Sequence, residues 1–300
     1  QYCQIMLDFQ PITIESFHDI LPYLKQQTYR TCDFTIGGIY MWIDYFQYEY
    51  CIADDLLFIK GYAENENKKL SFTIPIGASS LSHGISLLKE YCDNHHLPLF
   101  LSAVPEEGKR QIEMLFSCQS TPLPDWSDYL YDQKDLSILP GRKFNKKRNR
   151  VNKFYKEYTN ISYEPITINN IEAVKQFFRE FYSINQKESL YFAYEEEMVN
   201  QVLNNYFKLN FTGGILKAEG CIIGFSIGEI INDTLFVHIE KALKQYSGAY
   251  ETINFLFAQN AITPEVLYIN REEDVGDVGL RKAKLSYNPI HILTKYNIIL

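Results

Sequence analysis

The same order of secondary-structure patterns occurs twice along this chain, and this repetition restricts the folds that it can adopt. In the first half, a hairpin around Asp54 and Asp55 is followed by a strand, a helix, a short strand and a second helix. In the second half, a hairpin over residues 212–231 is followed by the same four elements. We therefore expect an α+β (mixed α/β) protein with two tandem domains, each a mixed sheet flanked by helices. One fused sheet is the alternative.

The segment between the two halves is basic, whereas the rest of the chain is acidic. The formal net charge is −8, yet residues 142–156 contain eight basic residues and no acid. These are Arg142, Lys143, Lys146, Lys147, Arg148, Arg150, Lys153 and Lys156. A concentrated positive strip on an acidic chain favours an anionic partner at one place; a solvated helix face is the alternative.

Apolar residues at helical spacing indicate that the basic segment is a helix, with one side facing the body of the protein. The residues on that side are Phe144, Val151, Tyr155 and Tyr158. Lys147 and Arg148 fall near the same side, and a cation that points inward needs a carboxylate or a bound anion. We expect an N-terminal domain over residues 1–140, a basic linking helix over 141–159, and a C-terminal domain over 160–300 that carries the active site.

Composition and motif searches exclude several classes of protein. The six cysteines contain no Cys-x-x-Cys pair; they are Cys3, Cys32, Cys51, Cys92, Cys118 and Cys221. We therefore expect reduced core residues in a cytoplasmic protein, without a metal site. No apolar run approaches the roughly 18–20 residues that a membrane-spanning helix needs. The absence of P-loop, dinucleotide, HExxH and GxSxG motifs excludes common NTPases, Rossmann oxidoreductases, zinc proteases and serine hydrolases.

Several motifs together resemble one protein family. They are GRKFNKKRNRVNK over residues 141–153, HIEKA over 238–242, GAY over 248–250, YINREEDVG over 268–276 and GLRKAKLSY over 279–287. Over most of its length, the chain is similar to soluble relatives of the phosphatidylglycerol lysyltransferase C-terminal domain. This resemblance implies tandem GNAT-like acyl-CoA N-acyltransferase folds, related to the Fem-type aminoacyltransferases.

The same resemblance implies an acyltransferase and limits its donors. Membrane relatives transfer an aminoacyl group from a charged tRNA to a lipid head group, and Fem-type relatives transfer it to a cell-wall precursor amine. In CoA-dependent relatives, a Gln/Arg-x-x-Gly-x-Gly/Ala turn cradles the pyrophosphate. The matching stretch here, residues 245–250, ends in Tyr250 instead of a small residue. We therefore expect an aminoacyl-tRNA donor, with acyl-CoA as the alternative, a small-molecule or lipid head-group acceptor, and no permanently bound cofactor.

Two polar segments of the second half are candidates for catalysis. Alternation along a strand puts His238 and Glu240 on one face, where they can act as base and orienting carboxylate; a buried sheet histidine is the alternative. Asn270 and Arg271 directly follow an apolar strand, and the carboxyl ends of strands bind ligands in open α/β sheets. They can hold a carbonyl or a phosphate; an acidic loop that caps the next helix is the alternative. We expect both segments to lie on neighbouring strands that open into one cleft.

The remaining candidates are charged residues of the same motifs. Those predicted to bind substrate are Arg148, Lys147, Lys241, Glu272, Glu273, Asp274, Lys282 and Lys284. Those predicted to bind nucleic acid are Arg142, Lys143, Lys146, Arg150 and Lys153. The predicted function is transfer of an acyl or aminoacyl group from a tRNA-linked donor to an amine or hydroxyl. The alternatives are a CoA-dependent N-acetyltransferase and a non-catalytic RNA-binding protein with the same fold.

Overall fold

The computed structural model describes residues 5–62, 69–185 and 190–300, so Cys3 lies outside the described residues. The chain divides into two compact units. The first comprises Gln1–Asp128, Glu273–Val278 and Ile292–Leu300, and the second comprises Tyr129–Glu272 and Gly279–His291. Within the described residues, every helix is too short or too polar to span a bilayer.

The first unit is built on a mixed sheet with the strand order β1-β2-β3-β4-β6-β15-β7, and β5 pairs with β3. Its strands are β1 (Gln10–Pro11), β2 (Glu49–Ala53), β3 (Leu56–Tyr62), β4 (Leu70–Phe72), β5 (Ile76–Gly77), β6 (Phe100–Pro105), β7 (Gln119–Pro122) and β15 (Lys295–Ile299). Its α-helices are α1 (Phe17–Leu24), α2 (Ile36–Tyr40), α3 (Ile43–Phe46), α4 (Leu81–Asn94) and α5 (Glu106–Leu115). Short 3-10 helices span Cys32–Phe34 and Pro124–Trp126.

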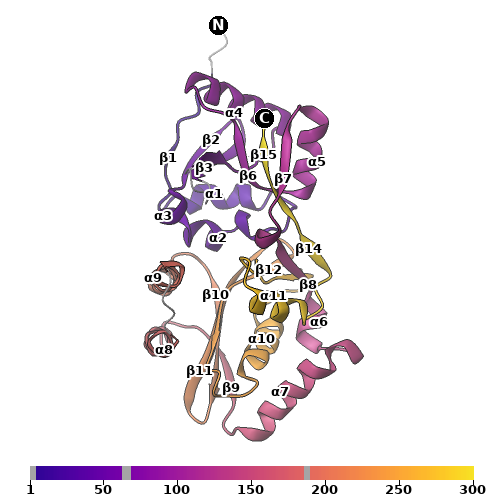
Figure 1. The fold of residues 1–300 in the computed structure, drawn as a ribbon. Coiled ribbons are helices and arrows are strands. Elements are labelled where there is room, and N and C mark those ends of the chain that lie inside the picture. Colours follow the sequence, from indigo (N-terminus) through magenta and orange to yellow (C-terminus); the bar gives the residue numbers. More distant parts are fainter. Residues whose placement is uncertain (1–4, 63–68, 186–189) are drawn as a thin grey trace. The chain divides into compact units, whose positions relative to one another are not determined.

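The second unit is also built on a mixed sheet, with the order β14-β8-β13-β12-β11-β10-β9. Its strands are β8 (Asp128–Asp132), β9 (Ser162–Pro165), β10 (Thr212–Ala218), β11 (Cys221–Ile231), β12 (Thr234–Ala242), β13 (Tyr268–Asn270) and β14 (His291–Leu293). Its helices are α6 (Gln133–Ile138), a 3-10 turn (Arg142–Phe144), α7 (Asn145–Glu157), α8 (Ile171–Ile184), α9 (Leu190–Asn204), α10 (Ala249–Asn260) and α11 (Val278–Leu285). In this unit, α10 and α7 lie on one face of the sheet, and α8 and α9 lie on the other (Figure 1).

The repeated order of elements that the sequence predicts is confirmed. The β2–β3 hairpin is followed by β4, α4, β6 and α5, and the β10–β11 hairpin is followed by β12, α10, β13 and α11. In each unit the third strand pairs in parallel with the strand beyond the helix, β4 with β6 and β12 with β13. A parallel pair needs such a crossover, which is why the same helix position recurs.

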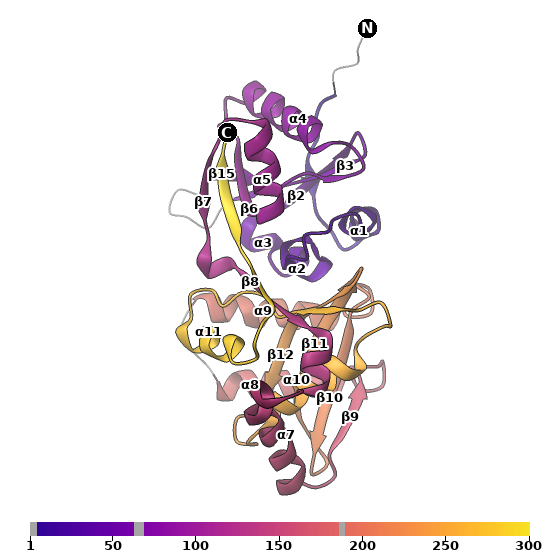
Figure 2. The same cartoon turned by 90° about the vertical axis from the view of Figure 1, so that its right-hand side faces the viewer.

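The bounds of the two units differ from the predicted ranges because each sheet takes one strand from the other half of the chain. The C-terminal strand β15 pairs with β6 and β7 and so completes the first sheet (Figure 2). Strand β8, which precedes the basic segment, pairs with β13 in the second sheet. Neither exchange follows from local pattern, because both depend on pairing between residues far apart in the sequence.

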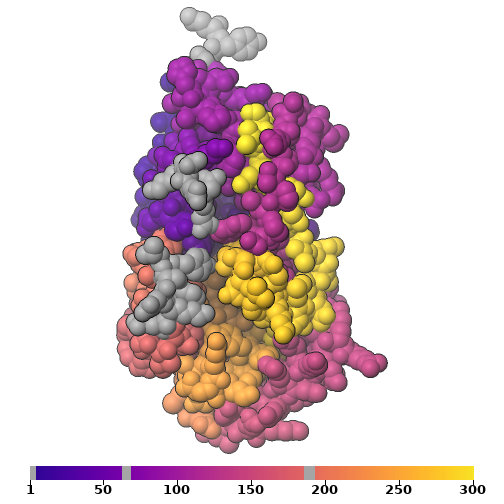
Figure 3. Space-filling view, in the orientation of Figure 1, coloured from indigo at the N-terminus to yellow at the C-terminus, as the bar shows by residue number. Residues whose placement is uncertain are grey.

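Helix α7 belongs to the second unit and is not a linker, because its apolar side packs on α10. Phe144 and Val151 are buried as predicted, but Tyr155 is 46% exposed, and the fully buried Phe154 takes its place. Tyr158 is half-buried against Tyr246. The outer side of this segment forms part of the molecular surface (Figure 3).

Free thiols occupy both core and surface positions. Of the described cysteines, Cys32, Cys51 and Cys92 are buried, whereas Cys118 is half-buried and Cys221 is exposed. All five are reduced, as predicted, but the expected core placement holds for only three of them.

A buried ammonium group fixes β15 in the first unit. The side chain of Lys295 is 1% exposed, and its Nζ lies 2.7 Å from a carboxylate oxygen of both Asp33 and Asp128. Glu273 Oε2 lies 3.4 Å away and Cys32 Sγ 3.6 Å away. Although burial lowers the pKa of Lys295, the surrounding acids raise it well above its usual value, so the residue stays charged.

We expect Lys295→Met to lower the free energy of unfolding by about 3–5 kcal/mol at neutral pH, because it leaves buried carboxylates without a counter-charge. The deficit should shrink as the pH falls and these carboxylates become protonated. Urea titrations of the wild type and the variant measure both effects, with the exposed Lys69→Met as the matched control. A loss no larger than that of the control would contradict this role.

Candidate active site

His238 occupies a bulge in the second sheet. Ile227 pairs with Ile239 whereas Gly228 pairs with Val237, so His238 is the extra residue on β12. Gly228 permits the bulge, because a Cβ at that position would lie 2.2 Å from the carbonyl oxygen of Phe236.

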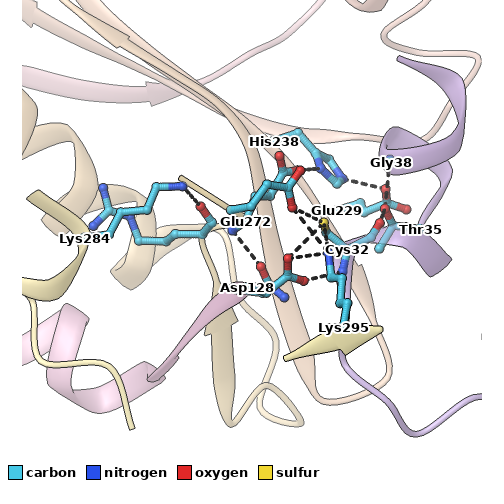
Figure 4. A network of polar contacts seen from close by, with 12 residues as sticks. Cys32, Thr35, Gly38, Asp128, Glu229, His238, Glu272, Lys284 and Lys295 are labelled. Atoms are coloured by element: carbon cyan, nitrogen blue, oxygen red, sulfur yellow. Dashed lines mark hydrogen bonds and ion pairs between the residues drawn. The ribbon is translucent and has the colours of Figure 1, made fainter. Parts of the chain in front are cut away.

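The imidazole of His238 is held between two carboxylates (Figure 4). Its Nε2 lies 2.6 Å from Glu229 Oε1, and its Nδ1 makes a short contact with Glu272 Oε1. The side chain is only 1% exposed. Burial lowers the pKa of His238, but Glu272 and Glu229 outweigh that effect and raise it to about 10. Both ring nitrogens therefore donate at neutral pH, an arrangement that fits the buried sheet histidine better than a general base.

Glu240 and Arg271 form a second charged cluster in the same unit. Glu240 Oε2 accepts a 3.0 Å hydrogen bond from Ser226 Oγ, its cross-strand neighbour. Its Oε1 lies 3.5 Å from both Asn254 Nδ2 and Arg271 Nη2. Burial raises the pKa of Glu240, and the nearby Arg271 charge partly opposes this. Three elements thus converge on one carboxylate: β11, α10 and the segment after β13.

Aromatic rings surround the Arg271 guanidinium. Its Cζ lies 5.6 Å from the ring centroid of Tyr131 and 4.7 Å from that of Tyr287. Lys147 of α7 places its Nζ 4.1 Å from the same Tyr287 centroid. The ring of Tyr287 therefore connects the basic helix with the Glu240–Arg271 cluster.

Two polar atoms of this cluster are left without a hydrogen-bond partner in the described part of the chain. They are Arg271 Nη1 and Asn254 Oδ1, and both are buried. Because a buried orphan donor or acceptor is costly, such a pair beside a carboxylate marks a place where a polar ligand would be stabilised.

The other predicted catalytic and substrate-binding residues are dispersed. Strands β12 and β13 are parallel neighbours, as predicted, but the fully buried Asn270 uses its Oδ1 to accept from the backbone N–H of Glu272. Lys284 donates from Nζ to the carbonyl oxygen of Arg271, and Lys241 pairs with Glu195 at 2.6 Å. Lys282 is exposed.

Two of the acidic residues predicted to bind substrate lie in the first unit, where they form contacts that stabilise its fold. Glu273 belongs to the Lys295 cluster, and the buried Asp274 accepts from the backbone N–H of Gly276. Cys32, Asp128 and Glu273 offer ligand atoms within 4.8 Å of one another, a spacing that a metal ion tolerates. Lys295 contacts all three, so an ammonium group supplies the positive charge there.

The basic strip is partly neutralised by acids that lie outside it in the sequence. Three of its cations form ion pairs: Lys143 with Asp135 at 3.3 Å, Arg150 with Glu251 at 2.7 Å and Lys153 with Glu157 at 3.3 Å. Arg148 points toward the chain, as predicted, but donates to the carbonyl oxygens of Leu139 and Gly141. The exposed cations that make no ion pair within the described residues are Arg142, Lys146 and Lys156.

Helix α7 also covers the N-terminus of α10, where the pyrophosphate turn of CoA-dependent relatives would lie. Gly248 adopts φ +87°, and a Cβ there would lie 2.9 Å from the carbonyl oxygen of Arg150. The backbone N–H of Ser247 donates to Tyr158 Oη, and Glu251 in the first turn pairs with Arg150. Tyr158 and Arg150 thus engage one backbone donor and one first-turn carboxylate at the start of α10.

Sequence reasoning missed several residues that the clusters require. Glu229 is a charged residue inside the largely apolar strand β11, a signal that marks a buried ion pair, whereas Lys295 stands at the start of β15. Asn254 and Tyr287 join the Arg271 cluster through helix packing and an aromatic contact. No local pattern distinguishes them from other polar and aromatic residues.

Comparison with known proteins identifies the family. Residues 25–299 match the family model described as phosphatidylglycerol lysyltransferase, C-terminal. The chain belongs to this family. The resemblance predicted from the motifs is therefore confirmed.

Solved structures extend this family match. A conserved protein of unknown function from Bacteroides thetaiotaomicron is 33% identical, with a TM-score of 0.90 over 98% of this chain and 100% of that one. L-PGS from Bacillus licheniformis has a TM-score of 0.60 at 14% identity, covering 99% and 93%. FemX has a TM-score of 0.63 at 8% identity, covering 98% of both chains. The predicted mixed α/β fold, with two mixed sheets flanked by helices, is confirmed and is shared with FemX. Family and fold together suggest an acyltransferase.

A curated relative covers less of the chain. An uncharacterized protein from Mycoplasmoides gallisepticum is 26% identical over 183 residues, which are 57% of this chain and 55% of the relative. The match thus spans about half the length of each protein.

The ion triad of His238 predicts a pH-dependent contribution to stability. Because the folded pKa is raised from 6.5 to about 10, the contribution is complete below the lower value and is lost as the pH rises toward the upper one. The difference in free energy of unfolding between wild type and His238→Gln should therefore shrink between these pH values. Urea titrations measure it, with His83→Gln, which removes a surface pair with Asp54, as the control. A constant difference across this range would be inconsistent with a charged His238.

Proposed function

We propose that this protein transfers an aminoacyl group from an aminoacyl-tRNA to an amine or hydroxyl acceptor. The observation that carries the proposal is the Glu240–Arg271 cluster, which holds an unpartnered guanidinium nitrogen and contacts the basic helix through Tyr287. The family model is described as phosphatidylglycerol lysyltransferase, C-terminal, and L-PGS and FemX share the fold, so the proposed reaction class agrees with the family.

The cluster supplies the groups that acyl transfer needs. Arg271 Nη1 is a buried donor that can stabilise the oxyanion formed when the ester carbonyl is attacked. Asn254 Oδ1, which has no hydrogen-bond partner among the described residues, offers an acceptor for a substrate ammonium group beside it. An aminoacyl ester is already activated, so much of the rate can come from positioning.

The position of α7 supports a tRNA-linked donor over acyl-CoA. A CoA pyrophosphate needs the backbone N–H groups at the start of α10, and there Tyr158, directly after α7, accepts from Ser247 and the Arg150 carbonyl lies close to Gly248. Lys146 and Lys156 of α7, with Arg142 in the preceding 3-10 turn, are exposed where phosphates of a nucleic acid can reach them.

A direct assay separates this function from its alternatives. Purified protein is incubated with radiolabelled aminoacyl-tRNA and a panel of amines and of vesicles containing phosphatidylglycerol. Transfer of label to an acceptor is the expected result. Stable tRNA binding without transfer would favour an RNA-binding protein, and turnover of acetyl-CoA would favour an N-acetyltransferase.

Reversing the exposed cations of the basic segment that make no ion pair within the described residues should weaken tRNA binding. We expect Arg142→Glu, Lys146→Glu and Lys156→Glu together to lower affinity and to reduce the slope of log K against log salt by about 2–3, one for each lost phosphate contact. Filter binding at several salt concentrations measures the slope. The matched control reverses three exposed lysines outside α7, Lys89, Lys134 and Lys208. Equal losses in both triple variants would mean that α7 is only a solvated face.

Arg271→Lys should lower kcat for aminoacyl transfer by about 10²–10³, because lysine keeps the charge but lacks the second guanidinium nitrogen. The effect on KM should be smaller if the contact forms mainly in the transition state. Single-turnover kinetics with labelled aminoacyl-tRNA measure both, and the exposed Arg110→Lys is the control. An unchanged kcat would remove Arg271 from the proposed chemistry.

A further inference from the structure

Transfer to an amine requires a group that accepts a proton, and the residue predicted for this task does not suit it. His238 donates from both ring nitrogens to carboxylates and has no lone pair to offer. Glu240 has its two oxygens engaged by Ser226, Asn254 and Arg271. The proton acceptor is therefore another side chain of the second unit.

We propose that Lys147 takes up the proton that the acceptor amine releases during acyl transfer, an inference that rests on the proposed function. Lys147 lies on the inward side of α7 and is half-buried. Its Nζ lies 4.1 Å from the ring centroid of Tyr287, and the guanidinium of Arg271 contacts the same ring. It is thus the amine that the fold brings next to the proposed oxyanion donor.

Lys147 lacks the carboxylate partner that other cations of the basic segment have. No carboxylate of the described residues forms an ion pair with it, in contrast to Lys143 in the preceding 3-10 turn and Lys153 of α7. The charged groups that act on it are Glu251 of α10, Arg150 of α7 and Arg271 after β13.

Burial and the two arginines act in one direction on the pKa of Lys147, and Glu251 acts in the other. Glu251 is itself paired with Arg150 at 2.7 Å. Burial, the largest effect, lowers the pKa of Lys147, and Arg271 and Arg150 lower it further against the opposing Glu251. A lysine that gives up its proton more readily than a surface lysine can act as a proton acceptor.

The step balances without an external reagent. The acceptor nitrogen, initially –NH₃⁺, forms the new C–N bond and loses two protons. One proton goes to the neutral Nζ of Lys147, which becomes –NH₃⁺. The other goes to the ribose oxygen as the C–O ester bond breaks. The products are an amide and a free tRNA 3′ end, and Lys147 then returns its proton to solvent.

Two measurements test the proposal. First, kcat and KM for aminoacyl transfer to an amine are measured against pH for the wild type, Lys147→Arg and Lys147→Gln. Arginine keeps the charge but stays protonated, so both variants should lose about 10²–10⁴ in kcat and lack the rise of rate with pH that the wild type shows. Affinity for tRNA should stay close to that of the wild type. The exposed Lys208→Arg, in the same unit but outside the basic segment, is the matched control.

Second, competitive labelling of the unaltered protein with acetic anhydride, followed by mass spectrometry, reports the pH at which each lysine becomes reactive. Lys147 should react at lower pH than Lys146 and Lys153, a result that needs no variant to fold. A Lys147 that titrates with the surface lysines, or a Lys147→Arg variant with wild-type kcat and pH profile, would overturn the proposal while leaving the proposed function intact. A wild type that transfers nothing to any acceptor would overturn both.

Discussion

The turn that follows β13 holds the charged side chains of the second unit in place, and both of its ion clusters depend on it. Asn270 Oδ1 accepts from the backbone N–H of Glu272, and the backbone groups of Arg271 and Glu272 bond with Tyr129 on β8. Lys284 donates to the carbonyl oxygen of Arg271. With the backbone fixed in this way, Arg271 extends to Glu240 and Glu272 extends to His238. Two consecutive residues thus serve two different clusters.

The three buried charged clusters, around His238, Lys295 and Arg271, differ in how completely their charged groups are paired. This difference distinguishes clusters that stabilise the fold from one that can bind a ligand. His238 donates at both nitrogens, and Lys295 is surrounded by acids. The hydrogen-bond donors of both side chains are therefore already paired within the protein. Arg271 meets one carboxylate at 3.5 Å and keeps a buried nitrogen without a partner. A buried unsatisfied donor costs about 1–3 kcal/mol, and a carbonyl or oxyanion at that position would recover it. The incompletely satisfied cluster is therefore the better candidate for chemistry.

Local sequence patterns predicted the repeated elements and the neighbouring strands β12 and β13. Strand alternation and helical spacing depend only on residues that are close together in the sequence. These patterns did not predict that β8 and β15 complete sheets built from the other half of the chain, because strand pairing depends on long-range contacts. The same limit applies to charges. His238 was recognised as a polar residue on a strand, but its partner Glu229 lies on β11, and the bulge that turns the imidazole toward it has no local signature.

The packing of the basic helix determines how much of its positive charge remains unpaired. A run of cations without an acid favours anion binding at sequence level, yet Asp135, Glu157 and Glu251 neutralise three of its members. The packing of α7 on α10 produces this arrangement and places Lys147 on the aromatic ring next to Arg271. One contact between helices therefore covers the end of α10, leaves a few cations exposed and brings an unpaired amine to the cluster. A change that separates α7 from α10 would affect all three properties at once.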